Sequence, residues 1–101
     1  MNRTEHLLIK LGEECAEIQK EVAKAQLFGL DDCKPGTTVS NLDAIRHEYN
    51  DLHAIVEMLK EAGIDLPVSR EKIDEKKRRV EIWMEHARSK GILTEVAHDI
   101  V

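Results

Sequence analysis

Apolar residues recur with the same spacing of 3-4-3-4-3 in two separate segments of the chain, and this pattern constrains the fold more than any other feature. The two segments contribute these positions: Leu8, Leu11, Cys15, Ile18, Val22 and Ala25, then Leu42, Ile45, Tyr49, Leu52, Val56 and Leu59. Such a seam is typical of helices that pack almost parallel in a bundle. We therefore predict an all-α fold in which these two helices lie side by side or against copies of themselves.

The first long helix is bounded by a cap and a glycine. Asn2, with Glu5 three positions later, resembles the start of a capping box, and the periodic pattern continues to Gly29. We predict a helix over residues 3–28 that ends with Gly29 in the αL conformation. A Pro-Gly pair among small polar residues then predicts a loop at residues 31–38.

Two further helices have the same kind of start and stop signals. A polar cap and a closing glycine bound each of them: the second from Ser40 or Asn41 to about Ala62, and the third from Ser69 to about Lys90. The apolar pattern of residues 92–101 fits either a short helix or an extended arm. The sequence thus predicts two long helices, a third helix and a short tail.

Length and charge limit the domain count and the partners. The chain has 101 residues, enough for one small domain over residues 1–101, and 15 Lys and Arg against 20 Asp and Glu give a net charge of −5. Duplex binding depends on basic side chains that neutralise phosphates, so we expect no nucleic-acid partner. Apolar stretches are far shorter than the ~20 residues that span a bilayer, which predicts no membrane partner and a cytoplasmic location.

The two cysteines, Cys15 and Cys33, are interpreted as free thiols, with Cys15 buried in the seam and inert.

Acidic residues repeat at one-turn spacing on both long helices. Glu14 and Glu17 share one flank of the first helix, and Glu48 and Asp51 occupy the same angular position on the second. If the helices are antiparallel neighbours, these four carboxylates converge into a cage of oxygen ligands suited to Mg²⁺ or Mn²⁺. The alternative is a solvated acidic face. Like charges at this spacing repel each other by about 0.2–0.5 kcal/mol per pair, which favours a cation that supplies the missing charge.

The acidic segments resemble the paired motifs of a known enzyme family. Residues 11–18, with the sequence LGEECAEI, and residues 47–52, HEYNDL, are similar to the EExxE and ExxD motifs of the all-α NTP pyrophosphatases, the MazG-like family. The likeness covers roughly residues 5–90 and includes a basic third helix. One departure is the long span from Glu17 to Glu48, which an extended loop would accommodate.

The resemblance implies an activity, a cofactor and a set of site residues. It implies a Mg²⁺-dependent hydrolase that cleaves a nucleoside triphosphate, expected to be a deoxynucleotide, between the α and β phosphorus atoms to give a monophosphate and pyrophosphate. The implied metal ligands, which are also catalytic residues, are Glu14, Glu17, Glu48 and Asp51. Glu13 would be a further catalytic residue that holds a second metal or orients the attacking water.

The same resemblance predicts a bundle completed by oligomerisation, as a homodimer or homotetramer. The apolar seams of the two long helices predict the same, because the shorter third helix alone cannot cover them.

Two alternatives remain for the function. One is an enzyme like phosphoribosyl-ATP pyrophosphatase, which shares this fold class. The other is a non-catalytic helical adaptor whose acidic faces are solvated.

A basic stripe with an aromatic residue at its end runs along the third helix: Lys72, Lys76, Arg79 and Trp83. These side chains are candidates for substrate binding, with the cations on the β and γ phosphates and Trp83 stacked on a base. The alternative is a solvated basic face with Trp83 in the core. Residues 1–66 carry 13 acidic and 7 basic side chains, whereas residues 67–101 carry 7 acidic and 8 basic ones.

The five histidines predict no zinc site, because no two of them have the i, i+4 spacing of a helical zinc-binding pair. His47 is nevertheless next to Glu48 in the second acidic segment. We interpret His47 as a surface residue, with a contact to a substrate phosphate as the alternative.

Overall fold

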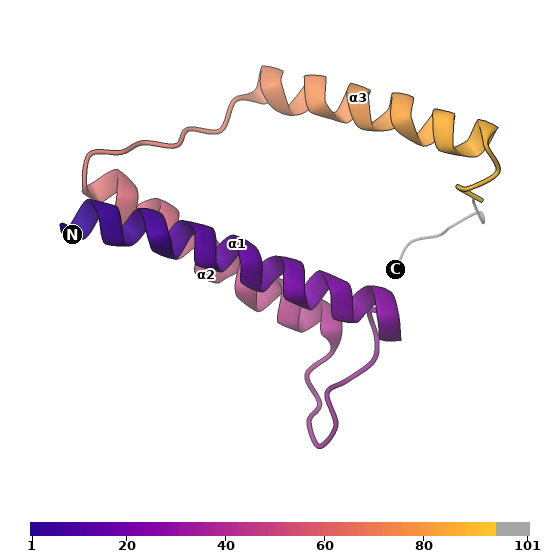
Figure 1. Ribbon diagram of the computed structural model, residues 1–101, viewed down its shortest axis with the longest axis horizontal. Helices are drawn as coiled ribbons and strands as arrows, with labels where there is room; N and C mark the ends of the chain where they lie inside the picture. Colours follow the sequence, from indigo (N-terminus) through magenta and orange to yellow (C-terminus); the bar gives the residue numbers. More distant parts are fainter. Residues whose placement is uncertain (95–101) are drawn as a thin grey trace. The chain divides into compact units, whose positions relative to one another are not determined.

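The computed structural model describes residues 1–94, and this part of the chain is built from three α-helices. They are α1 (Arg3–Phe28), α2 (Asn41–Glu61) and α3 (Arg70–Ser89), drawn in Figure 1. No strand occurs within residues 1–94, where the β contact is an isolated bridge in the loop between α1 and α2. The predicted all-α class is therefore confirmed. Residues 92–94 are not helical, and the rest of the predicted tail lies outside the described residues.

Each helix begins at the cap that its sequence predicts. In all three, an Asn or Ser side chain accepts a hydrogen bond from the backbone N–H three residues later: Asn2 from Glu5 at 2.8 Å, Ser40 from Asp43 at 3.0 Å and Ser69 from Lys72 at 3.3 Å. α1 ends at Gly29, whose φ of 93° and ψ of 153° lie in a region that is essentially restricted to glycine. This is not the αL conformation that we predicted, although the residue type and the helix end are as expected.

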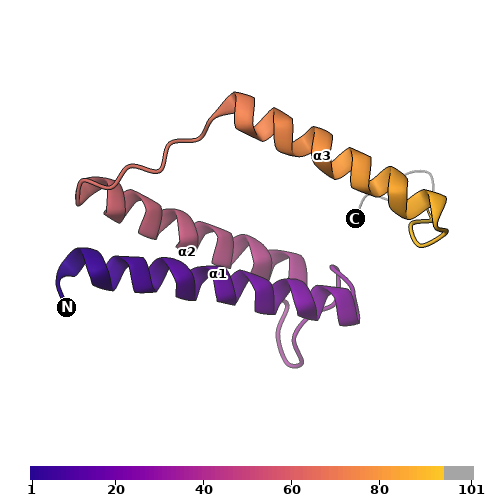
Figure 2. The same ribbon diagram turned by 45° about the horizontal axis from the view of Figure 1, so that its top comes forward.

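α1 and α2 lie side by side and antiparallel, as Figures 1 and 2 show. At one end, Leu7 of α1 packs with Ile55 and Leu59 of α2 in the hydrophobic core of the pair. At the other end, the Leu42 N–H donates to the Leu30 carbonyl at 3.0 Å. The prediction that the two long helices are neighbours is confirmed, and residues near the middle of one helix face the middle of the other.

The stripe by which α1 faces α2 differs from the predicted seam. Leu8, Cys15 and Val22 of α1 are exposed, and so is Tyr49 of α2. The buried and half-buried stripe of α1 keeps three residues of the seam, Leu11, Ile18 and Ala25, and adds others, among them Leu7, Glu14, Glu17 and Glu21. The predicted burial of Cys15 is therefore wrong. The apolar surface of α1 is wider than one neighbouring helix covers, and α2 packs on the side of α1 that carries Glu14 and Glu21.

The loop between α1 and α2 is closed at its base by hydrogen bonds. Asn41, a buried residue, donates from Nδ2 to the Gly29 carbonyl at 2.8 Å and from its backbone N–H to the Asp32 carbonyl at 2.8 Å. Further along, the Lys34 N–H donates to the Val39 carbonyl at 3.3 Å. The segment therefore leaves the helix pair and returns to it as a closed loop, visible below α1 and α2 in Figure 1.

The chain divides into two compact units, Met1–Leu66 and Pro67–Val101. The first contains α1 and α2, and the second contains α3, none of whose residues is buried. The unit boundary coincides with the change in charge noted above, since the acidic excess lies entirely in the first unit. No helix in the part of the chain that the structure describes is both long and apolar enough to cross a membrane.

Candidate functional site

The four predicted ligands, Glu14, Glu17, Glu48 and Asp51, lie in the middle of the α1–α2 pair and are half-buried. Glu14 is the most enclosed of those with a measured side chain, which is 13% exposed. Half-burial at a helix interface is not what a solvated acidic face would show, because such a face turns its carboxylates toward water. The sequence pattern therefore placed these residues on the correct side of each helix.

The charges of carboxylates on both helices act on Glu48 and shift its pKa. Partial burial raises the pKa of Glu48, and the negative charges of Asp51, Glu17 and, more weakly, Glu14 raise it further. A charged His47 acts in the opposite direction. Two of these neighbours belong to α1, so the pKa of Glu48 depends on charges from both helices. Convergence of all four carboxylates around one ion stays a prediction.

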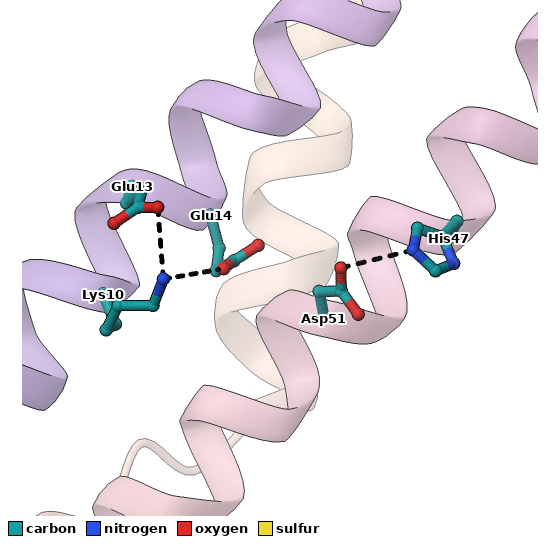
Figure 3. Close-up of polar contacts among 5 residues, drawn as sticks. All are labelled: Lys10, Glu13, Glu14, His47 and Asp51. Carbon is teal, nitrogen blue, oxygen red and sulfur yellow. Dashed lines mark hydrogen bonds and ion pairs between the residues drawn. The ribbon is translucent and has the colours of Figure 1, made fainter.

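Lys10 of α1 forms ion pairs with the carboxylates of Glu13 and Glu14. Its Nζ lies 3.1 Å from Glu13 Oε1 and 3.8 Å from Glu14 Oε1 (Figure 3). The hydrogen bond to Glu13 and the charge of that residue raise the pKa of Lys10, and Glu14 adds to the effect. Glu13 itself is exposed, and its ion pair within residues 1–94 is the one with Lys10.

On α2, His47, Glu48 and Asp51 form a compact group of metal-ligand type. One ligand atom from each residue lies within 4.8 Å of the others, and His47 Nε2 is 3.6 Å from Asp51 Oδ2 (Figure 3). His47 is a surface residue, as predicted, with a side chain that is 74% exposed. The sequence analysis did not predict its contact with Asp51, for which the i, i+4 spacing of the two residues is the signal.

Glu21 is a second residue of the site that sequence reasoning missed. It is 4% exposed, its Oε1 lies 3.5 Å from Lys24 Nζ, and its Oε2 is buried without a hydrogen-bond partner among the described residues. Glu21 follows Glu17 by one turn on the same stripe of α1. Together with Ala44 and Glu48 it lines a surface pocket of about 390 Å³.

The predicted substrate-binding residues of α3 belong to the second unit. Lys72 and Lys76 line one surface pocket with Pro67 and Ile73. Trp83 is 68% exposed, so the alternative that placed it in a core is wrong for this structure. Arg79 and Trp83 do not line that pocket, and a role of the four side chains in substrate binding stays a prediction.

The donor set of the carboxylate group fits a hard divalent cation. Carboxylate oxygens are the ligands that Mg²⁺ and Mn²⁺ prefer, and the mutual repulsion at Glu48 is the kind of charge excess that such an ion compensates. A single imidazole among them is compatible with Mn²⁺ and less typical of Mg²⁺. Comparisons of the chain with protein-family models, with curated proteins and with solved structures found no match.

Proposed function

We propose that this chain is a Mg²⁺-dependent nucleoside triphosphate pyrophosphohydrolase, the activity that its resemblance to the MazG-like family implies. The single observation that carries the proposal is the half-burial of four carboxylate side chains, those of Glu14, Glu17, Glu48 and Asp51, in the middle of the helix pair. An antiparallel pair with a small aliphatic core at one end has no structural need for half-buried carboxylates at its centre. A bound cation would account for carboxylates at this position.

The residues that would hold the cation are Glu14, Glu17, Glu48 and Asp51. A bound divalent cation supplies charge neutralisation for the triphosphate oxygens and acidifies water. Hydrolysis then consumes one water and gives a nucleoside monophosphate and pyrophosphate. No protein nucleophile is required, since phosphoryl-transfer catalysis is mostly positioning and electrostatic stabilisation.

The neighbours of the carboxylates have positioning roles in this proposal. Lys10 fixes one oxygen of Glu14, and His47 fixes one oxygen of Asp51, so each helix has one carboxylate held by a cationic or polar partner. Such partners orient ligands and limit their rotation. Glu13 contributes by holding Lys10 rather than by contact with the reacting groups.

Self-association is part of the proposal. Leu8, Ile9 and Val22 of α1 and Ile82 and Trp83 of α3 are exposed, and a helix pair with this little core is a weak structure on its own. We expect a homodimer or homotetramer that covers these residues. Sedimentation that shows a well-folded monomer at micromolar concentration would contradict this part.

The test is an assay of the full chain for pyrophosphate release from a panel of ribonucleoside, deoxyribonucleoside and modified triphosphates, with phosphoribosyl-ATP included, in the presence of Mg²⁺ or EDTA. We expect Mg²⁺-dependent release from at least one triphosphate. A cation site also predicts thermal stabilisation of about 2.7 kcal/mol at a Mg²⁺ concentration 100 times the dissociation constant. Release from phosphoribosyl-ATP alone would favour the related enzyme. No release together with no Mg²⁺ stabilisation would favour the helical adaptor.

A further inference from the structure

Three lysines of the first unit lie near its carboxylates, and they differ in how they are paired. Lys10 and Lys24 of α1 each form an ion pair with a glutamate within one turn of the same helix. Lys34 of the loop has no ion pair within residues 1–94, although it lines the pocket of about 390 Å³ together with Glu21 and Glu48. The ammonium group of Lys34 is therefore available to a ligand, whereas the other two already have carboxylate partners.

The backbone of Lys34 is held in place, while its side chain is exposed. The Lys34 N–H donates to the Val39 carbonyl at 3.3 Å, and the Lys34 carbonyl accepts from the N–H and the hydroxyl of Thr37, each at 3.0 Å. These bonds fix the Cα atom from which the side chain extends, and the flexible four-carbon stem lets the ammonium group adjust. Lys34 can thus meet a ligand in the pocket without a rearrangement of the loop.

The pocket that Lys34 lines adjoins the candidate cation site. Glu48 belongs to both, so a ligand held by a cation at the carboxylates would extend past Glu48 toward Lys34. The volume of the pocket falls at the lower end of the range for small-molecule sites, about 300–1,000 Å³. The basic stripe of α3 belongs to the second unit, so Lys34 is the unpaired lysine that the carboxylate-bearing unit itself places beside this site.

The charges around Lys34 select the kind of anion that can bind. Three carboxylates line the pocket with it, those of Glu21, Asp43 and Glu48, and they would repel a free anion. A divalent cation at Glu48 would remove most of this repulsion and would itself attract phosphate oxygens. An ammonium group is a common partner of phosphates, which it binds as a point charge. The ligand that suits both features is a polyphosphate chain that contacts the cation and the lysine together.

We propose that Lys34 binds the polyphosphate chain of the substrate, by donating hydrogen bonds from Nζ to phosphate oxygens. This inference rests on the proposed function, because the cation site is what brings the phosphates to the pocket. It gives the loop between α1 and α2 a direct part in substrate binding, a role that the sequence analysis assigned to α3 alone. Lys34 is a binding residue in this proposal and takes no part in the activation of water.

The experiment measures the binding of inorganic pyrophosphate and tripolyphosphate to the full chain by isothermal titration calorimetry, with Mg²⁺ and with EDTA. The variants are Lys34→Ala and Lys34→Arg. The matched control is Lys60→Ala, an exposed lysine at the opposite end of α2. Both alanine variants lose one positive charge, so their comparison separates a local contact from the overall charge of the chain.

We expect Lys34→Ala to raise the dissociation constant of tripolyphosphate in Mg²⁺ about tenfold or more, because a charge-assisted hydrogen bond is lost. Lys34→Arg keeps the charge and should stay within about threefold of the parent, and Lys60→Ala should bind as the parent does. The Mg²⁺-induced rise in melting temperature should persist in Lys34→Ala, since Lys34 is not a metal ligand. With an active parent, the KM for the triphosphate should rise.

Unchanged tripolyphosphate binding in Lys34→Ala, an equal loss in Lys60→Ala, or no binding by the parent would overturn this inference. The proposed hydrolase would stand in each case if the parent still releases pyrophosphate with Mg²⁺. A lower melting temperature of Lys34→Ala with an unchanged dissociation constant would show that Lys34 only screens the carboxylates, and would overturn it too. If polyphosphate binding depends on Lys34 but no nucleoside triphosphate is cleaved, the phosphate contact stands and the proposed hydrolase fails.

Discussion

The helix pair α1–α2 and helix α3 differ in their content of apolar residues and in what they bury. In the pair, Leu59 is completely buried and four carboxylates are half-buried. In α3 no residue is buried, and Ile82 and Trp83 are each about two-thirds exposed. Apolar periodicity therefore indicates which face of a helix can be covered, but not whether anything in the same chain covers it. Only the pair has the packing needed to hold carboxylates in place.

The largest effect that this comparison predicts is on stability. Leu59→Ala removes the most buried side chain of the pair and should lower the free energy of unfolding by about 2–5 kcal/mol. Ile82→Ala, on the exposed surface of α3, should change it by less than about 0.5 kcal/mol in the isolated chain. Urea denaturation at a concentration where the chain is monomeric measures both. A similar loss in the two variants would mean that α3 is packed as tightly as the pair.

The second prediction concerns the carboxylates of the pair. Under the proposed function, Glu48→Gln should reduce pyrophosphate release more than about 100-fold, because it would remove a proposed ligand and not merely a partner of a ligand. It should also abolish the Mg²⁺-induced rise in melting temperature. Without metal, the variant should be as stable as the parent or more so, since the neighbouring charges of Asp51 and Glu17 disfavour the ionised group.

The pH dependence of that difference has a definite sign. The folded state raises the pKa of Glu48, so the unfavourable ionised form is present above this pKa and is lost as the pH falls through it. The stability advantage of Glu48→Gln over the parent should therefore shrink on acidification, as paired thermal melts in EDTA would measure. An active variant with a lower metal-free melting temperature would contradict the assignment of a cation site to the pair.

A smaller effect is expected in α3. Lys76→Ala and Arg79→Ala should each lower kcat/KM about tenfold, the effect of one charge-assisted hydrogen bond to a substrate phosphate, while the Mg²⁺ response stays intact. The matched control is Arg78→Ala, an exposed residue between them on the same helix. Steady-state kinetics and metal titrations separate the two outcomes. Equal kinetics in all three variants would leave α3 as a solvated basic helix.

The smallest effect is expected at the loop end of the pair. Asn41→Ala removes the hydrogen bond to the Gly29 carbonyl and should lower the free energy of unfolding by about 1 kcal/mol. Because the aliphatic core lies at the opposite end, the loss should be well below that of Leu59→Ala. Denaturation of the two variants in parallel measures the ratio, and equal losses would mean that the loop end stabilises the pair as much as the core.

Much of the fold could be predicted from local signals. The caps at Asn2, Ser40 and Ser69 act through side-chain bonds within a few residues, so the sequence determines them without knowledge of tertiary structure. The choice of packing stripe on α1 is a tertiary property. Leu7 and Leu8 are equally apolar, and only the position of α2 decides that the first is buried and the second exposed.

For the carboxylate residues, too, local spacing in the sequence predicted the helix flank, whereas tertiary packing decides the burial. Repeated charges of one sign at one-turn spacing identified Glu14, Glu17, Glu48 and Asp51 as residues on facing flanks. Glu21 could not be identified in this way, since a glutamate with a lysine three positions later has the pattern of an ordinary surface ion pair. Its burial is a property of the folded chain, in which it lines a pocket with Ala44 and loop residues that are more than 10 positions away in the sequence.

The closed loop between α1 and α2 also has a consequence for how the helix pair tolerates changes in its connection. Its base is tied by bonds between Asn41 and the Gly29 and Asp32 backbone, so insertions beyond that base do not move either helix. Doubling the length of a flexible loop costs only about 0.6 kcal/mol in closure entropy. The length of the loop can therefore change at little cost to the pairing of α1 with α2.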